Sequence, residues 1–435
     1  MVIVAKFGGS SVANSSQFKK VKDIVTSNPN RRVVVASALG KKEKGDSKIT
    51  DLLYLLHAHL KYNVPYTQVW EMIRNRFNQV KLDLGLQMDI LAELDNLEKE
   101  LSKDISVDYL VSRGEYLTSK LMAEYLGFTF IDASDIIKFK FDGTVDQEET
   151  YKLTLESFEK YGKIVIPGFY GSYPNGTIKT FSRGGSDITG ALVASGINAI
   201  EYENWTDVSG VLITDPRIVP NAQATKEITY EELRELSYMG ASVLHEETIF
   251  PVQQLNIPIH IKNTNAKDDF GTIITNESSD FSQIITGISG KKQFTSFTIT
   301  KKQYVSKTKI VLQVLKIFDK YKINIEHIPS SIDSFSVVVS SQEVSKVQYD
   351  IVSEIDALEQ VESISIDNDI ALVAVVGRNM ITKPGISGKI FSILGKNNIN
   401  IKMIAQGSHE ISIIVGVSNN NFEDAIKAIY ENIVK

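Results

Sequence analysis

Residues 181–194 read FSRGGSDITGALVA, and they place an arginine, two glycines, a hydroxyl group and a carboxylate at the start of an apolar helical pattern. Ser186 is expected to cap this helix, and Asp187 falls in its first turn. The glycines let the backbone approach a ligand, and the amides and dipole of a helix start attract negative charge. The guanidinium group of Arg183 matches a carboxylate. The stretch therefore predicts an anion site, with a serine-capped glycine turn as the simpler alternative.

A second glycine motif stands near the amino terminus. Residues 2–5 form a short apolar run typical of a buried strand, and they lead into KFGGSSV at residues 6–12. A Walker A loop has its lysine after the glycines, whereas Lys6 precedes Gly8 and Gly9. Its ammonium group would reach over the turn toward a phosphate bound by the amides of both glycines. The two motifs together indicate a phosphate site.

Composition narrows the class of protein. A chain of 435 residues predicts two or three domains, and 43% hydrophobic with 23% charged residues is typical of a globular protein. The net charge of -6 argues against nucleic-acid binding. The absence of cysteine excludes disulfides and thiolate chemistry. No apolar run resembles a signal peptide or approaches the roughly 18 residues of a membrane span, so we expect a cytoplasmic protein without membrane contact.

The first 275 residues alternate short β-branched runs with helical stretches, which predicts an α/β fold with a mainly parallel sheet covered by helices. The expected strands are residues 2–5, 32–36, 128–132, 163–167, 199–204 and 257–262. Ligands of such sheets gather at the carboxyl ends of the strands. We expect one cleft to be lined by the residues that follow these ends: Lys6, Ser37, Gly168 and Asp207. Residues 69–101 have the spacing of two amphipathic helices outside the sheet.

Both glycine motifs resemble the signatures of the amino-acid kinase superfamily and, within it, of aspartokinases. The resemblance covers essentially the whole chain and implies ATP-dependent phosphorylation of the side-chain carboxylate of L-aspartate to 4-phospho-L-aspartate. This is the first step of lysine, threonine and methionine biosynthesis. Mg²⁺ would arrive with ATP, because the scattered histidines suggest no metal site. Two alternatives stay open: a superfamily kinase acting on glutamate or acetylglutamate, and a non-catalytic amino-acid sensor.

The resemblance also assigns residues to the substrates. The catalytic residues would be Lys6, Gly8, Gly9 and Asp187, of which Asp187 organises the cationic groups and the substrate amine. Aspartate would be bound by Ser37, Thr50, Glu115 in the segment VSRGE, and Arg183. ATP would be bound by Lys6, Gly8, Gly9, Thr206, Asp207, Leu212, Arg217 and Ser242. Many relatives have tyrosine where this chain has Leu212 and lysine where it has Ser242, so both are departures from the family pattern. On residue type alone, Glu115 would be an ordinary helix-start acid.

The ATP-binding stretch, ENWTDVSGVLITDPR at residues 203–217, also makes chemical sense by itself. Thr206 and Asp207 end an expected strand and can bind a base or ribose. Asp215 and Pro216 form a rigid turn that would aim Arg217 at a phosphate. The simpler interpretation of Arg217 is a solvated side chain after an Asp-Pro turn.

An internal repeat follows a polar linker at residues 276–280. KINIEHI at residues 322–328 recurs as NINIKMI at residues 398–404, an offset of 398 minus 322, or 76. Each copy predicts strand, helix, strand, strand, helix, strand, which is a ferredoxin-like unit. The pair resembles tandem ACT domains. The expected domains are residues 1–280 for catalysis, 305–368 for an inserted first ACT copy, and 292–304 with 369–435 for the second. By family precedent, residues 294–300 would join the sheet of the second copy.

An ACT pair implies feedback control by an amino acid, with lysine favoured over threonine. By resemblance, the effector site lies in the first copy, between residues 307–311 and 324–332, at an interface of a homo-oligomer, either a dimer or a tetramer. Its expected contacts are Asn324, Ile325, Glu326, Ser330 and Ser331. Glu326 could bind the lysine amine, whereas the matching residue of the second copy is Lys402. The simpler interpretation of Glu326 is a solvated acid at a strand end.

Overall fold

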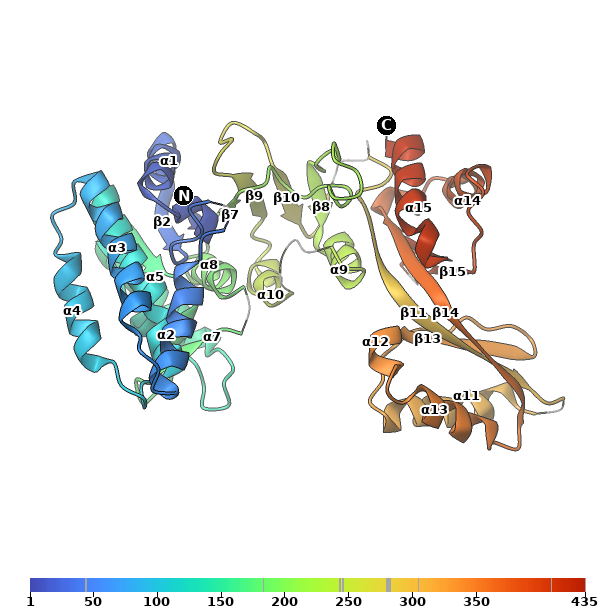
Figure 1. Ribbon diagram of the computed structural model, residues 1–435. Coiled ribbons are helices and arrows are strands. Elements are labelled where there is room, and N and C mark those ends of the chain that lie inside the picture. Colours follow the sequence, from blue (N-terminus) through green and yellow to red (C-terminus); the bar gives the residue numbers. More distant parts are fainter. Residues whose placement is uncertain are drawn as a thin grey trace. The chain divides into compact units, whose positions relative to one another are not determined.

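Figure 1 shows the structure, a computed structural model that describes residues 1–43, 45–182, 184–241, 244, 246–278, 283–303, 305–407 and 409–434. The chain forms two compact units. The first contains residues 1–211, 224–230 and 243–278, and the second contains residues 212–223, 231–242 and 279–435. The first unit thus ends close to the boundary expected at residue 280, but two earlier segments belong to the second unit.

A mainly parallel sheet forms the centre of the first unit. Within the described residues its order is β3 (Thr129–Phe130), β4 (Ile164–Pro167), β2 (Arg31–Ala36), β1 (Ile3–Phe7), β7 (Glu201–Thr206), β9 (Ile259–Asn263), β10 (Thr272–Thr275) and β8 (Glu227–Thr229). Only the β9–β10 pair is antiparallel in this described sheet. All six predicted strands are present, with ends shifted by at most two residues. The α/β fold class is therefore confirmed.

Helices cover both faces of this sheet (Figure 1). On one face α1 (Ser15–Ser27) and α5 (Val107–Leu126) contact the sheet, and α2 (Ile49–Lys61), α3 (Thr67–Leu84) and α4 (Ile90–Glu100) pack outside them. These helices share a core with Phe7 and Trp205. The other face packs against α8 (Gly185–Gly196), which contacts α7 (Gln147–Tyr161) and α10 (Glu246–Gln254). Two helices, α3 and α4, occupy the stretch 69–101, as the apolar spacing predicts. The remaining elements are η1 (Gly9–Val12), α6 (Ala133–Ile136) and the hairpin of β5 (Tyr170–Ser172) and β6 (Ile178–Thr180).

The start of α8 differs from the expectation. The helix begins at Gly185, and its N-cap is Gly184 with φ of 59°, a left-handed conformation that favours glycine. Ser186 therefore lies in the first turn and is not the cap. The Ser186 side chain packs instead against the turn after β4, where a Cβ at Gly168 would lie 2.5 Å from it.

The second unit is built on a sheet with the order β12 (Ile325–His327), β13 (Ser334–Ser340), β11 (Gly287–Lys301), β14 (Val361–Val376), β16 (Ser412–Val417) and β15 (Met403–Gln406) within the described residues. Its helices are α9 (Tyr230–Tyr238), α11 (Lys307–Lys320), α12 (Ser341–Val344), α13 (Gln348–Asp356), α14 (Ile386–Lys396) and α15 (Phe422–Ile429). It also contains two short 3₁₀ helices, η2 (Arg378–Met380) and η3 (Asn419–Asn421), and the π-helical segment η4 (Tyr430–Val434).

The two repeats share the long strands β11 and β14, which run side by side in Figure 1. Residues 294–300 pair with β13 of the first copy, whereas residues 287–291 pair with residues 372–376 of the second. The expectation that residues 294–300 join the second copy is therefore wrong, and the preceding segment takes that place. Each copy still has its own core, with Phe297 in the first and Ile288 in the second.

The repeat itself is confirmed by backbone geometry. Lys322 and Asn398, which lie 76 residues apart, both have φ of 56°, so the same left-handed turn follows α11 and α14. Regarding membranes, none of the helices in the described part of the chain combines the length and apolar character that a span requires.

Candidate functional site

Three polar side chains, the buried Lys6 and Asn204 and the half-buried Asp187, meet on the face of the sheet that α8 covers. The ammonium Nζ of Lys6 lies 2.5 Å from Oδ1 of Asp187 and 3.3 Å from Oδ1 of Asn204. The amide Nδ2 of Asn204 donates to the same Asp187 oxygen at 2.9 Å. Lys6 is 7% exposed and Asn204 4% exposed. A cation, a carboxylate and an amide thus form one closed hydrogen-bonded group, in which the lysine charge is balanced.

The backbone explains how these three residues meet. Lys6 and Asn204 are directly paired on the parallel strands β1 and β7, so their side chains point to the same face. Asp187 comes from the first turn of α8, and the hydroxyl of Tyr202 donates to its carbonyl oxygen at 3.0 Å. The sequence reasoning found Lys6 and Asp187 but missed Asn204. Its signal was its position two residues before Thr206, on the same strand face.

The carboxyl ends of β4, β2, β1 and β7, which were expected to line one cleft, lie side by side at one edge of the sheet. Gly168 donates to Ala36, Ser37 donates to Phe7, and Gly8 donates to Trp205, each through its backbone amide at 2.9 to 3.1 Å. These bonds join the carboxyl ends of β4, β2, β1 and β7 in order. Lys6 itself lies inside β1, one residue before its end, and its side chain therefore projects from the sheet.

The glycine turn after β1 is shaped by a close backbone contact. A Cβ at Gly40 would lie 2.4 Å from the carbonyl carbon of Gly9, and the Gly40 amide donates to the Gly9 carbonyl at 3.0 Å. The amide of Gly8 is already bound by the carbonyl of Trp205. A phosphate could use this amide only by displacing that bond, so Gly9 is the better placed of the two predicted amides.

Glu115 lies on α5 in an unusual setting for a carboxyl group. It is 4% exposed, and its Oε2 atom has no hydrogen-bond partner among the described residues. Burial raises the pKa of Glu115 to about 8, although a hydrogen bond from the Ala38 amide acts in the opposite direction. An unpaired carboxyl oxygen at this depth is costly unless a ligand supplies a donor. A substrate ammonium group would do so.

The other predicted aspartate-binding residues surround the same loop. Ser37 is half-buried directly after β2, and Thr50 lies in the first turn of α2. A Cβ at Gly114 would lie 3.0 Å from the Cβ of Ala38 and 3.2 Å from Ile49, so α5, the loop after β2 and α2 pack closely here. Arg183 lies outside the described residues.

The predicted nucleotide residues fall on both units. In the first unit, Thr206 ends β7 and its hydroxyl donates to Asp207 at 3.2 Å. In the second unit, the Arg217 guanidinium lies 2.6 Å from the Asp215 carboxylate, and this hydrogen bond lowers the pKa of Asp215. Arg217 is thus folded back on its own turn. Leu212 is also in the second unit, and Ser242 lies outside the described residues.

The predicted effector residues lie in the second unit, around β12. Asn324 donates its backbone amide to Glu343 at 3.1 Å, and the carbonyl of Ser331 accepts from Lys307 at 2.5 Å. Glu326 accepts a hydrogen bond from Tyr238 of α9, whose pKa is raised to about 12 by burial and by this carboxylate.

The remaining predicted contacts occupy the same strand end. Ile325 is half-buried in β12, and Ser330 forms a backbone bridge with Phe335. At the matching position of the second copy, Lys402 is already bound by Asp367 at 3.0 Å and Asp369 at 3.4 Å. The two copies therefore differ in charge at this point.

Comparison with known proteins gives these sites a context. Residues 1–263 match the amino acid kinase family, and residues 373–433 match an ACT domain. The chain is 32% identical to aspartokinase 3 of Bacillus subtilis over 98% of both proteins. The chain belongs to the aspartokinase family. Members of this family are enzymes, and its ACT domains provide allosteric regulation.

Solved structures agree with this family. Aspartate kinase of Clostridium acetobutylicum superposes with a TM-score of 0.90 at 46% identity, covering 99% of each chain. Aspartokinase III of Escherichia coli, solved with aspartate and ADP, superposes with a TM-score of 0.75 at 25% identity over the full length of both chains. The same E. coli protein has also been solved with lysine and aspartate.

Proposed function

We propose that this enzyme transfers the γ-phosphoryl group of ATP to the side-chain carboxylate of L-aspartate and releases 4-phospho-L-aspartate and ADP. The observation that carries the proposal is the hydrogen-bonded group of Lys6, Asp187 and Asn204. The E. coli relative solved with aspartate and ADP supports the choice of both substrates.

The chemistry requires positioning and charge more than proton transfer. An aspartate carboxylate is ionised at neutral pH, so one of its oxygens can attack the γ-phosphorus while the bond to the bridging oxygen of ADP breaks. Lys6 would turn from Asp187 toward the transferred phosphoryl group, and Asn204 would keep Asp187 in place. The Gly9 amide would add a neutral donor. Mg²⁺ would arrive with ATP, since no cluster of metal-ligating side chains occurs in the described residues.

The substrates would be divided between the predicted residues. Glu115 would bind the aspartate ammonium group, Arg183 its α-carboxylate, and Ser37 and Thr50 the remaining polar atoms. Thr206 and Asp207 would bind the nucleotide. Leu212, Arg217 and Ser242 stay predicted nucleotide contacts, and Arg217 would first have to leave Asp215.

We further propose feedback inhibition by lysine through the first ACT copy, where Glu326 offers a carboxylate and the second copy offers only the paired Lys402. The name of one relative, the lysine-sensitive aspartokinase 3 of E. coli, supports lysine over threonine. A homo-oligomer formed through the ACT copies and a cytoplasmic location belong to the same proposal.

One assay tests the reaction. Purified protein would be supplied with ATP, Mg²⁺ and hydroxylamine, which traps acyl phosphates as hydroxamates, together with aspartate, glutamate or acetylglutamate. We expect one hydroxamate per ADP with aspartate and at most a few per cent of that rate with the other two acids. Lys6→Ala is the matched control for contaminating kinases. A preference for glutamate or acetylglutamate, or no turnover with any acid, would contradict the proposal.

A further inference from the structure

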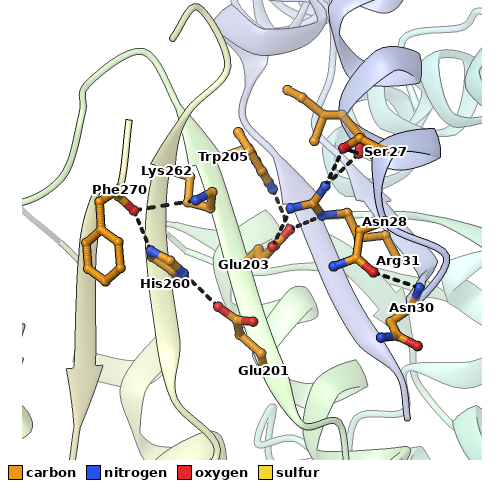
Figure 2. Close-up of polar contacts among 11 residues, drawn as sticks. Ser27, Asn28, Asn30, Arg31, Glu201, Glu203, Trp205, His260, Lys262 and Phe270 are labelled. Atoms are coloured by element: carbon orange, nitrogen blue, oxygen red, sulfur yellow. Dashed lines mark hydrogen bonds and ion pairs between the residues drawn. The ribbon is translucent and has the colours of Figure 1, made fainter. Parts of the chain in front are cut away.

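Strand β7 carries a second polar network on the face opposite the candidate site. Alternate residues of a strand point to opposite faces, so Tyr202 and Asn204 face α8 while Glu201, Glu203 and Trp205 face away from it. Figure 2 shows this second network, which joins β2, β7 and β9. The proposed function does not yet use it.

The centre of this network is His260 on β9, which is 7% exposed. Its Nδ1 lies 2.7 Å from the Glu201 carboxylate and its Nε2 lies 2.6 Å from the carbonyl oxygen of Phe270, as Figure 2 shows. Both partners are hydrogen-bond acceptors, so the ring lies between the Glu201 carboxylate of β7 and the Phe270 carbonyl beyond the end of β9.

Other charged groups on this face have partners of their own. Arg31 binds Glu203 through two hydrogen bonds of 2.7 and 2.8 Å, and Trp205 donates to the same carboxylate at 2.8 Å. Lys262 reaches the Phe270 carbonyl at 3.4 Å, so it gives weaker support than His260. His260 is thus the main side-chain donor to the Phe270 carbonyl among the described residues.

Phe270 belongs to the turn between β9 and β10, defined here as the 263–271 turn. This turn forms hydrogen bonds with the loop at residues 206–211, which follows β7. Asp269 accepts from Ser209 at 2.5 Å, and Asn263 donates to the same Ser209 hydroxyl at 2.9 Å. Thr264 donates its amide to the Thr206 carbonyl at 2.9 Å. The loop at residues 206–211 is therefore bound to the turn at several points.

The 263–271 turn also reaches the glycine motif after β1. The hydroxyl of Thr264 donates to the hydroxyl of Ser11 at 2.7 Å, and Ser11 lies in η1, two residues after Gly9. One turn thus contacts both segments that are proposed to bind ATP. At its other end, the turn is bound by His260 through the Phe270 carbonyl.

We propose that His260 is a positioning residue for nucleotide binding: it fixes the 263–271 turn through the Phe270 carbonyl and thereby fixes the loop at residues 206–211. The inference rests on the proposed function, because it takes this loop as the nucleotide site. His260 itself touches neither substrate. Its loss should therefore weaken ATP binding more than aspartate binding.

The test compares three variants of the full chain. His260→Leu removes both hydrogen bonds, His260→Gln keeps one donor for the Phe270 carbonyl, and Ser209→Ala cuts the link between the turn and the loop. We expect His260→Leu and Ser209→Ala to raise the KM for ATP and the Kd for ADP, measured by calorimetry, about tenfold. The KM for aspartate should change less than about twofold. His260→Gln should recover part of the loss.

Arg31→Lys is the matched control, since it removes the two-point hydrogen bond to Glu203 on the same face without touching the turn. It should lower resistance to urea and leave ADP affinity within about twofold. Equal effects of Arg31→Lys and His260→Leu on ADP affinity would overturn the positioning role. If His260→Leu does not fold, His260→Gln and Ser209→Ala decide the question, and normal ADP affinity in both would overturn it.

One further variant separates this inference from the proposed function. If Asp207→Ala weakens ADP binding but the His260 and Ser209 variants do not, only the positioning role fails. If Asp207→Ala also binds ADP normally, the loop is not the nucleotide site and both proposals fall together.

Discussion

Replacing Glu115 by glutamine should raise the free energy of unfolding and weaken the binding of aspartate. Burial raises the pKa of this carboxyl group from 4.5 to about 8. Because the folded pKa lies above the unfolded one, the unfolded chain loses this proton first as the pH rises. Folding stability therefore falls between pH 4.5 and about 8 and is constant above that range. Glutamine does not titrate and removes this dependence.

The size of the effect follows from the shift. A carboxyl group with a pKa of 4.5 when unfolded and about 8 when folded costs the fold about 3 kcal/mol more at pH 8 than at pH 5. The free energy of unfolding of Glu115→Gln, relative to that of the wild type, should therefore rise by about 3 kcal/mol from pH 5 to pH 8. In opposition, the KM for aspartate should rise at least about a hundredfold, because glutamine offers no charge to the substrate ammonium group.

Urea unfolding followed by tryptophan fluorescence suits this measurement. The chain has two tryptophans, Trp70 and Trp205, and both are buried in the first unit, so the signal reports on the unit that contains Glu115. Unfolding curves at pH 5, 6, 7 and 8 would give the stability difference at each pH. Glu156→Gln, at an exposed site on α7, is the control. An advantage that does not change with pH, or a normal KM for aspartate, would refute the reasoning.

Three shorter predictions concern the other residues. Lys6→Ala should lower kcat at least about a hundredfold while urea unfolding stays cooperative, and a near-normal rate would remove Lys6 from the phosphoryl site. Asn204→Leu should lower kcat about tenfold, because Asp187 loses a hydrogen bond that keeps it in place; rescue by Asn204→Gln would argue against such a strict geometry. Glu326→Ala should keep most uninhibited activity and raise the lysine concentration for half inhibition at least about tenfold. Lys402→Ala is its control, and equal shifts in both variants would contradict an effector site in the first copy only.

Much of the fold could be predicted because its signals are local and repeated. The buried residues of the parallel strands β2 and β4 are all apolar, and the carboxyl ends of parallel strands lie at one edge of the sheet. The short strands β8 and β10 were missed, because three or four residues do not show a period. The assignment of residues 294–300 to the second copy was wrong, because the point at which β11 passes from the core of one copy to that of the other is set by pairing with distant strands.

The candidate site was predictable only in part, for a related reason. Charged residues beside glycines stand out, whereas Asn204 is one polar residue in a strand, and its meaning depends on its pairing with Lys6. The use of the Gly8 amide by Trp205 also depends on a contact between distant segments. The cap at Gly184 was missed because Ser186 is a good capping residue by type, whereas in the fold its side chain packs against Gly168, a contact between distant segments.

Because the two ACT copies share the strands β11 and β14, they become complete in a fixed order during synthesis. The second ACT copy takes one strand from residues 287–291 and the rest from beyond residue 370, so the entire first copy emerges from the ribosome between them. The first copy has all of its strands once β14 has been translated, whereas the second stays open until β16 and α15 follow. Until then the part of the sheet that contains residues 287–291 has an unpaired strand edge, and such an edge can pair with other chains and aggregate. We therefore expect truncation before β16 to leave the first copy folded and the chain prone to aggregate.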